Sequence, residues 1–274
     1  MSPSWNNRLY AAISPSHISM LMLGRGLKSK VMAKYDEAFT SPKESSWETA
    51  LDRLTQRLSQ PEWQKAEMHV VLSNRLLRFE TLNFGEQLNQ YAAQEAFAKY
   101  ALGQTYGAMS ERWTLRIQPA HKGSLRLVSA IDQLLLDGLR QACAAHQLKL
   151  KLVTPYLTPV YNRFQKQFQN APAWLVIHEP GYSLLALLSA GQFVAINGVY
   201  HDSIDELPVL LDRENLVSKL TEPCFQVNLY STALADLATI PKTQYQFSKL
   251  ELAVPDGFPS QADGLYSMLM SECL

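Results

Sequence analysis

The chain has 274 residues, enough for one large domain or for two smaller ones that each bury a core. Its 25 basic and 25 acidic residues cancel, so it lacks the charge excess typical of proteins that bind nucleic acid or anionic membranes. The three cysteines, Cys143, Cys224 and Cys273, have no CxxC spacing, and their odd number favours a reducing compartment over a disulfide framework.

Targeting and membrane signals are not found in the sequence. The N-terminus lacks a basic segment followed by an apolar one, so we do not expect a signal peptide. No apolar run reaches about 18 residues, so we expect no transmembrane helix. The nearest candidate, residues 182–198, is interrupted by Gly191 and Gln192 and is typical of a hairpin. These features predict a soluble, cytoplasmic protein.

The first part of the chain alternates predicted strands and helices, recognised by apolar spacings of about 2 and 3.6 residues. Ser46 is expected to be the N-cap of the first helix, with Glu48 in its first turn. Asp132 is expected to cap the third helix and to favour its dipole. The predicted strands are 8–14, 18–23, 27–35, 68–72, 76–84, 113–117, 125–130 and 148–154, and the predicted helices are 46–58, 85–106, 131–146 and 155–168.

A short segment, residues 170–172, is the best linker candidate, and a second series of elements follows it. Residues 174–200 predict three consecutive strands, separated by a Pro-containing turn and a Gly turn. Further strands are predicted at 224–230 and 247–254, and helices at 206–220, 232–237 and 264–273. Strand meanders joined by helical crossovers favour an α/β architecture.

One segment occurs twice. Leu9–Tyr35 aligns with Trp174–Tyr200 without a gap, at an offset of 165 residues, the distance from Pro15 to Pro180. Both copies predict strand, turn, strand, turn, strand. The duplication predicts two lobes with a cleft between them, the first at 1–170 with an inserted subdomain at about 76–130, and the second at 171–274. The identical pairs are Pro15 and Pro180, Leu23 and Leu188, Gly26 and Gly191, and Tyr35 and Tyr200.

A duplicated three-strand unit with crossovers is the organisation of the actin-like, or ribonuclease H-like, fold. Three segments of the chain resemble one group, the PilM, MshI and GspL-type proteins of pilus and type II secretion assembly, and they follow one another in the same order as in that group. The segments are VVLSNRLLRFETLNF (70–84), 127–164 and WLVIHEPGYSLLALLSAGQF (174–193). This resemblance implies two lobes, each with a mixed sheet and flanking helices, and an inserted α+β subdomain in the first half.

The resemblance stops at the nucleotide site. Nucleotide-binding members of the fold carry Asp-x-Gly in the first meander, where this chain has Ala12 and Ser14. In the second meander the same pattern is replaced by Ile177 and Glu179, or by His178 and Pro180 in the register shifted by one. The resemblance therefore implies a fold without its ATP chemistry and with no cofactor. The alternative is an ATP-binding protein with altered phosphate contacts.

Polar residues at the turns of the two meanders are the candidates for the cleft: Ser14, Ser16, His178, Glu179 and Gly181. A small-molecule enzyme using His178, Glu179 and His201 is a further alternative. A metal site needs three or four convergent ligands, and none is predicted. We expect the pairs His178-Glu179 and His201-Asp202 to cap strand ends in solvent.

The other candidate motifs favour structural roles. The segment 24–29 (GRGLKS) does not fit GxxxxGK[ST] and lies between two strands, so it predicts a turn rather than a phosphate loop. Cys143 lies in a predicted helix and is expected to be packed, and Cys224 is expected to begin a strand. Neither has a neighbouring cation that would mark a nucleophile.

Arginines and aromatic residues gather around the predicted insertion, a composition typical of protein interfaces. The family resemblance implies a partner-binding surface in this region, and the alternative is an ordinary half-buried strand. The sequence thus predicts a non-catalytic cytoplasmic scaffold, peripheral to the inner membrane through a partner that is a pilus or secretion assembly protein, with an assembly ATPase as a second partner. The partner-binding candidates are Arg75, Arg78, Phe79, Phe84, Tyr91 and Arg126.

Overall fold

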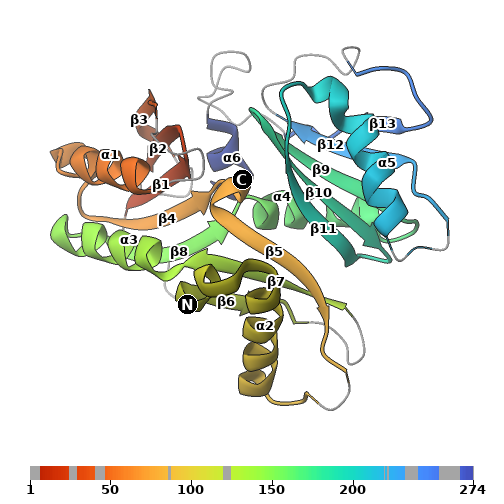
Figure 1. Cartoon of the computed structure of the whole chain (residues 1–274). Helices are drawn as coiled ribbons and strands as arrows, with labels where there is room; N and C mark the ends of the chain where they lie inside the picture. The colour runs from red at the N-terminus through yellow and green to blue at the C-terminus, as the bar shows by residue number, and fades with distance from the viewer. Residues whose placement is uncertain are drawn as a thin grey trace. The chain divides into compact units, whose positions relative to one another are not determined.

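The computed structural model describes residues 7–24, 30–40, 47–85, 88–119, 125–218, 220, 222–231, 240–252 and 266–273 (Figure 1). The chain forms two compact units. The first unit comprises Met1–Leu77, Asp132–Val160 and Leu252–Leu274, and the second comprises Arg78–Ile131 and Tyr161–Glu251.

A five-stranded sheet forms the centre of the first unit, in the order β3-β2-β1-β4-β8. β1, β2 and β3 are antiparallel neighbours, and β4 and β8 run parallel to β1. β1 and β2 are almost continuously apolar because both faces of the sheet are covered, whereas β3 at the edge is half exposed and carries charges. The strands are β1 (Asn7–Ser14), β2 (His17–Leu23), β3 (Val31–Ala38), β4 (Ala66–Leu72) and β8 (Lys149–Pro155).

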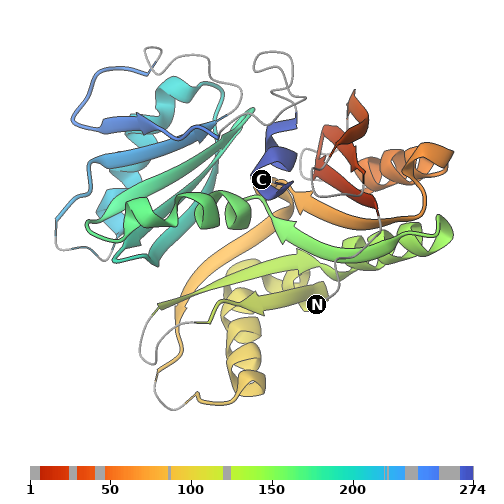
Figure 2. The same ribbon diagram turned by 180° about the vertical axis from the view of Figure 1, so that it is seen from behind.

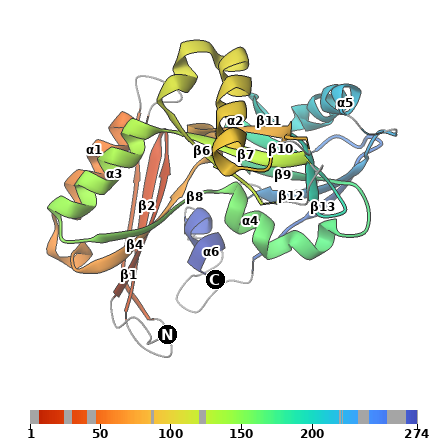
Figure 3. The same ribbon diagram turned by 90° about the horizontal axis from the view of Figure 1, so that it is seen from below.

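Helices cover both faces of this sheet. α1 (Glu48–Leu58) and α3 (Gln133–Ala145) lie side by side on one face, and α6 (Ser267–Cys273) lies on the other (Figure 3). α1 turns Ala50, Leu54 and Leu58 inward at the helical spacing of four. On the opposite face Leu269 and Met270 of α6, with Tyr266 just before it, pack against apolar residues of β1 and β2. Two short 3-10 helices, η1 (Pro61–Trp63) and η2 (Asn74–Leu76), flank β4.

A second five-stranded sheet, in the order β11-β10-β9-β12-β13, repeats the arrangement of the first. α5 covers one face of this sheet (Figure 1). Its Leu207 and Leu211 pack there with Trp174 and Val176 of β9. The opposite face carries α4, the green helix in the view from behind (Figure 2), followed by η4. The bounds are α4 (Leu157–Phe164), η4 (Gln165–Phe168), β9 (Ala173–Glu179), β10 (Tyr182–Ser189), β11 (Gln192–Tyr200), η5 (Ile204–Glu206), α5 (Leu207–Val217), β12 (Gln226–Ser231) and β13 (Gln246–Lys249).

The insertion predicted at 76–130 is a separate three-stranded sheet in the order β5-β7-β6, covered by α2. α2 turns Ala98 and Leu102 onto a core that includes Phe84 and Val128. Apart from Leu76 and Leu77, this insertion belongs to the second unit. The elements are β5 (Leu77–Asn83), α2 (Tyr91–Tyr106), η3 (Gly107–Arg112), β6 (Trp113–Ile117) and β7 (Leu125–Asp132).

A β-bulge links the insertion to the second sheet. The pairing of β10 with β11 shifts at Leu187 and Leu188, and this leaves Val194 without a paired residue. The carbonyl oxygen of Val194 accepts a hydrogen bond of 3.2 Å from Thr81 Oγ1 of β5. This contact lies within the second unit, whereas the sequence prediction assigned the insertion to the first lobe.

Replacing Thr81 with valine is expected to lower the free energy of unfolding by about 1 kcal/mol, because the shape is kept and the hydrogen bond to Val194 is lost. Urea unfolding followed by circular dichroism measures the change. Thr81→Ser keeps the hydroxyl and is the matched control. If the valine and serine variants are equally stable, the hydrogen bond does not contribute and apolar contacts alone hold the insertion.

The predicted duplication is confirmed for the first two strands and is wrong for the third. Ser14 pairs with His17 and Glu179 with Tyr182, at the same offset of 165 residues. In the third strand Met20 pairs with Tyr35, whereas its counterpart Leu185 pairs with Asn197, three residues before Tyr200. The cause is a tight two-residue turn between β10 and β11, with positive φ at both Ala190 and Gly191.

Several predicted boundaries are corrected. The helix predicted at 85–106 begins only at Tyr91, because Asn83 Oδ1 accepts a bond from the amide of Gly85, whose φ of 63° forms a turn. Pro155, expected in a helix, ends β8 opposite Leu72; this edge strand tolerates a residue without an amide donor. The N-cap of α1 is Trp47, which makes no side-chain cap bond. Asp132 caps α3 as predicted, since its Oδ1 accepts from the amide of Leu134.

Some predicted elements lie outside the described residues: Ser46, the helix 232–237, and parts of the strands 27–35 and 247–254 and of the helix 264–273. Where the last of these is described, as α6, it packs on the first sheet. The C-terminal segment therefore groups with the first unit, whereas the sequence prediction placed it in the second lobe.

Candidate functional site

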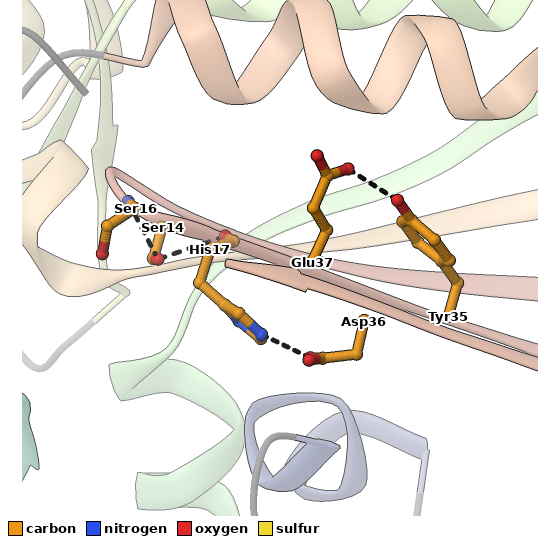
Figure 4. A network of polar contacts seen from close by, with 6 residues as sticks. All are labelled: Ser14, Ser16, His17, Tyr35, Asp36 and Glu37. Carbon is orange, nitrogen blue, oxygen red and sulfur yellow. Dashed lines mark hydrogen bonds and ion pairs between the residues drawn. The ribbon is translucent and has the colours of Figure 1, made fainter. Parts of the chain in front are cut away.

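The first meander turn satisfies its own polar groups (Figure 4). Ser14 Oγ donates to the carbonyl of His17 at 3.1 Å and accepts from the amide of Ser16 at 3.4 Å. Two of the predicted cleft residues, Ser14 and Ser16, are thus brought together within one turn. His17 Nε2 contacts Asp36 Oδ1 across β2 and β3. The polar groups of this turn are therefore occupied with holding the hairpin.

A second group of polar contacts ties β3 to α1. Tyr35 donates to Glu37 at 2.6 Å (Figure 4). The guanidinium of Arg57 lies 3.6 Å from the centre of the Tyr35 ring. Arg53 forms an ion pair with Glu37 at 3.5 Å. Burial and the hydrogen bond to Glu37 raise the pKa of Tyr35, and Arg57 partly opposes this rise. The group holds a helix against an edge strand.

The second meander brings together three side chains from consecutive strands. Ser183 Oγ, at the start of β10, lies 3.2 Å from His178 Nδ1 of β9 and 2.9 Å from His201 Nε2, just after β11. The two imidazole rings stack, with centroids 5.3 Å apart and planes inclined by 21°. We call these three residues the histidine cluster.

Burial dominates the electrostatics of the cluster. Loss of solvent, and secondarily the neighbouring His201, lower the pKa of His178 to about 4. Burial also lowers the pKa of His201, although Glu206 and Asp202 oppose this shift. Both rings are therefore neutral near pH 7. One of them accepts the hydroxyl proton of Ser183, and the other donates its N–H to the oxygen.

This shift predicts a loss of stability in acid. An unfolded imidazole has a pKa near 6.5 and takes up a proton before the folded His178 does, so unfolding is favoured as the pH falls from about 6.5 towards 4. We expect the His178 contribution to cost about 1 to 2 kcal/mol at pH 4.5, below the full shift because the ring keeps some solvent contact. Urea unfolding of the wild type and of His178→Asn at pH 7 and 4.5 measures it. Equal pH dependence in both proteins would contradict this assignment.

The remaining second-meander candidates have defined places. Gly181 adopts a φ of 73° in the turn, and its carbonyl accepts from the amide of His201 at 3.3 Å. Glu179 and His201 are only 6% and 7% exposed. The expectation that both histidine pairs cap strand ends in solvent is therefore wrong for these two side chains. His201 is held inward by its bonds to Ser183 Oγ and to the carbonyl of Gly181.

Sequence reasoning missed Ser183. It lies in the apolar strand β10 and is fully buried. A buried serine near a histidine on the preceding strand was the signal that could have revealed it, because buried hydroxyls require partners. Among the residues that the structure describes, no three His, Cys, Asp or Glu side chains are grouped as metal ligands.

The partner-binding candidates separate into buried and exposed residues. Phe79 and Phe84 are buried at 8% and 4% exposure. Arg126 donates to Gln94 at 2.9 Å and lies 5.5 Å from the centre of the Phe84 ring, so these two candidates are joined in one cluster. Tyr91 is 50% exposed at the start of α2.

Two arginines complete this candidate set. Arg75 lies in η2 of the first unit, and Arg78 lies in β5 of the second. Both are half-buried. Of the six candidates, Tyr91 therefore offers the most exposed side chain, whereas the two phenylalanines form core.

The other candidate motifs have structural roles where they are described, but Cys224, expected to begin a strand, lies two residues before β12 begins at Gln226. The amide of Gly24 donates to the carbonyl of Lys30 at 2.8 Å, which closes the turn, and residues 25–29 lie outside the described part. Cys143 is buried, and burial raises the pKa of its thiol to about 11. The described helices include none long and apolar enough to cross a membrane.

Comparison with known proteins gives matches in structure only. No protein-family model matches the sequence, and no curated protein matches it. A Bacteroides thetaiotaomicron protein with an actin-like ATPase fold and unknown function is similar with a TM-score of 0.59 and 12% identity, over 86% of each chain. The chain has the actin-like fold.

Two further solved structures are of the kinds that the sequence resemblance named. The cytoplasmic domain of EpsL, an inner-membrane component of the Vibrio cholerae type II secretion system, is similar with a TM-score of 0.58 and 16% identity, over 97% of this chain and 95% of that one. A structure of the PilM-PilN type IV pilus biogenesis complex gives a TM-score of 0.52 and 14% identity, over 77% of this chain and 66% of that one. The predicted fold class, with two lobes and mixed sheets, is confirmed.

Proposed function

We propose that this chain is a non-catalytic cytoplasmic scaffold that docks an inner-membrane protein of a type II secretion or type IV pilus assembly. The observation that carries the proposal is the similarity to the EpsL cytoplasmic domain over nearly the full length of both chains. The similarity to the PilM-PilN structure supports the same class of partner. Fold likeness alone does not establish function, so the proposal depends on a binding experiment.

The turns of both meanders support binding without catalysis. Asp-x-Gly is replaced in each copy, and Ser14 Oγ is already hydrogen-bonded within its own turn. Ser183 is fully buried, so its hydroxyl is not exposed for attack on a substrate. The proposal therefore assigns no catalytic residue, cofactor or metal. Calorimetric titration with ATP and Mg²⁺ tests this part, and micromolar binding would favour the ATP-binding alternative.

The partner surface is proposed around the insertion. Tyr91 supplies an exposed aromatic ring, and Arg75, Arg78 and Arg126 are half-buried cations in the same stretch of sequence. Aromatic residues and arginine carry much of the binding energy in protein interfaces. Phe79 and Phe84 shape this region from within. An assembly ATPase is the second partner that the proposal allows, and any contact with the inner membrane is indirect.

Replacing Tyr91 with alanine is expected to weaken the partner complex about tenfold, as for an aromatic side chain of intermediate importance at an interface. The chain would be co-expressed with the cytoplasmic segments of the pilus and secretion inner-membrane proteins from the same genome, and affinity measured by calorimetry. Tyr100→Ala is the matched control, because Tyr100 is 65% exposed and lies on the opposite side of the same helix from Tyr91.

The possible results distinguish an error in the proposed binding surface from an error in the proposed scaffold function. Loss of affinity in Tyr91→Ala but not in Tyr100→Ala supports the proposed surface. Equal affinity of both variants and the wild type places the interface elsewhere. A chain that binds none of these segments overturns the scaffold proposal itself.

A further inference from the structure

The histidine cluster has a geometry that the scaffold role does not use. We propose that His178, Ser183 and His201 form a proton-operated latch, which holds the ends of β9, β10 and β11 together at neutral pH and releases them in acid. The proposal stands on the arrangement of one hydroxyl between two stacked, poorly exposed rings.

The hydrogen bonds of the histidine cluster are complete only when both imidazole rings are neutral. Ser183 Oγ–H can donate once, and its oxygen can accept from N–H groups. With two neutral rings, one imidazole nitrogen accepts from the hydroxyl and the other ring donates to it, so all three atoms are paired without a net charge. A proton added to the accepting nitrogen makes both rings donors. The hydroxyl proton of Ser183, a fully buried residue, then loses its acceptor.

The surroundings do little to stabilise that added charge. Glu206, a backbone hydrogen bond at Ser203 and Asp202 favour the charged form of His201, but burial outweighs them and its pKa is lowered. Glu206 Oε1 also accepts from the amides of Asp202 and Ser203. Glu179 follows His178 on the same strand and points to the opposite face of the sheet. β12 places the uncharged Ser231 beside His178. The low pKa of His178 agrees with this environment.

Release of the latch has a defined structural consequence. His201 is tied to the β9–β10 hairpin twice, by its side chain to Ser183 Oγ and by its amide to the carbonyl of Gly181. The next residues build a capping box, in which Ser203 and Glu206 begin η5 and lead into α5. Because both rings then present N–H donors to one hydroxyl that has lost its acceptor, His201 moves away from the hairpin and both ties weaken. The start of α5 then separates from the turn at Gly181.

Hydrogen exchange of the full chain across pH 7.5 to 4.5 tests the latch, with each rate corrected for the intrinsic pH dependence of amide exchange. We expect the opening of residues 178–183 and 201–206 to increase about tenfold for each pH unit below about 6.5, the ordinary imidazole pKa. Residues 7–14 of β1 serve as the internal reference. His178→Asn places an amide where Nδ1 lies and cannot take up the proton. In this variant the opening of the same residues should therefore depend less steeply on pH. His146→Asn, on the C-cap of α3, is the matched control and should keep the slope.

Three results would overturn the latch: a wild-type opening that does not depend on pH, an unchanged slope in His178→Asn, or a flattened slope in His146→Asn. His201→Gln, which places an amide near Nε2, gives the same comparison if the first variant does not fold. NMR titration of the wild-type imidazoles decides independently of any variant. Two depressed and coupled pKa values support the latch, whereas two independent values near 6.5 contradict it.

Discussion

Replacing Trp174 with alanine is expected to lower the free energy of unfolding by about 4 kcal/mol, the largest single effect that we predict. Trp174 is 1% exposed on β9, the central strand of the second sheet, and packs in the core beneath α5. Its Nε1 also donates to the carbonyl of Cys224 at 3.2 Å. Truncation thus removes a large buried surface, leaves a cavity and breaks a hydrogen bond.

Two further variants separate these contributions. Trp174→Phe keeps most of the apolar surface and should cost about 1 to 2 kcal/mol, partly because the Cys224 carbonyl still accepts from Asn215 at 3.0 Å. Trp113→Ala is the matched control, because Trp113 is only half-buried at the edge of the insertion sheet. Circular dichroism during urea unfolding measures all three. A larger loss for Trp113 than for Trp174 would mean that the core beneath α5 is not the stabilising centre of the second unit.

Replacing Gly198 with alanine is the second large prediction, and its sign is opposite to the usual one. Alanine within a strand ordinarily stabilises relative to glycine by about 0.5 to 1 kcal/mol. At Gly198 a Cβ atom would lie 2.8 Å from Cζ of Tyr182, closer than real contacts allow. Tyr182 is buried and its ring packs edge-on against Tyr200, with centroids 5.2 Å apart, so it has little room to move. We expect Gly198→Ala to cost about 2 kcal/mol.

A double-mutant cycle tests this explanation. The hydroxyl of Tyr182 lies closest to the added methyl group, so Tyr182→Phe should relieve part of the clash. The double variant Gly198→Ala/Tyr182→Phe should therefore be more stable than the sum of the two single changes predicts, by about 1 kcal/mol. Strictly additive effects would show that the cost at Gly198 arises from the backbone and not from the aromatic ring.

Much of the fold could be predicted because it depends on local patterns. Continuous apolar runs predicted β1, β2, β9 and β10, and their constant offset revealed the duplication. Helical spacing predicted α1 and α3, and Asp132 marked the start of α3. These signals depend only on which residues a strand or helix buries.

The histidine cluster could not be predicted in the same way, because it depends on pairing between strands. The turn at Ala190 and Gly191 sets the register of β11, and that register decides that His201 reaches Ser183. A gap-free alignment with the first meander misplaces β11 by three residues. The grouping of the insertion with the second sheet was missed for a similar reason. The Thr81 contact depends on the β-bulge between β10 and β11, and no residue pattern in the sequence marks that bulge.

The division of the chain into its two units has a consequence for synthesis. The polypeptide crosses between the units after Leu77, Ile131, Val160 and Glu251, so neither unit is made from one continuous stretch. The sheet of the first unit is covered on one face by α6, which packs on Tyr10 and Leu21 and is synthesised long after them. The nascent chain therefore holds these apolar strands uncovered until α6 is made, a state that chaperones protect. A cut anywhere between Arg78 and Glu251 would therefore divide both units.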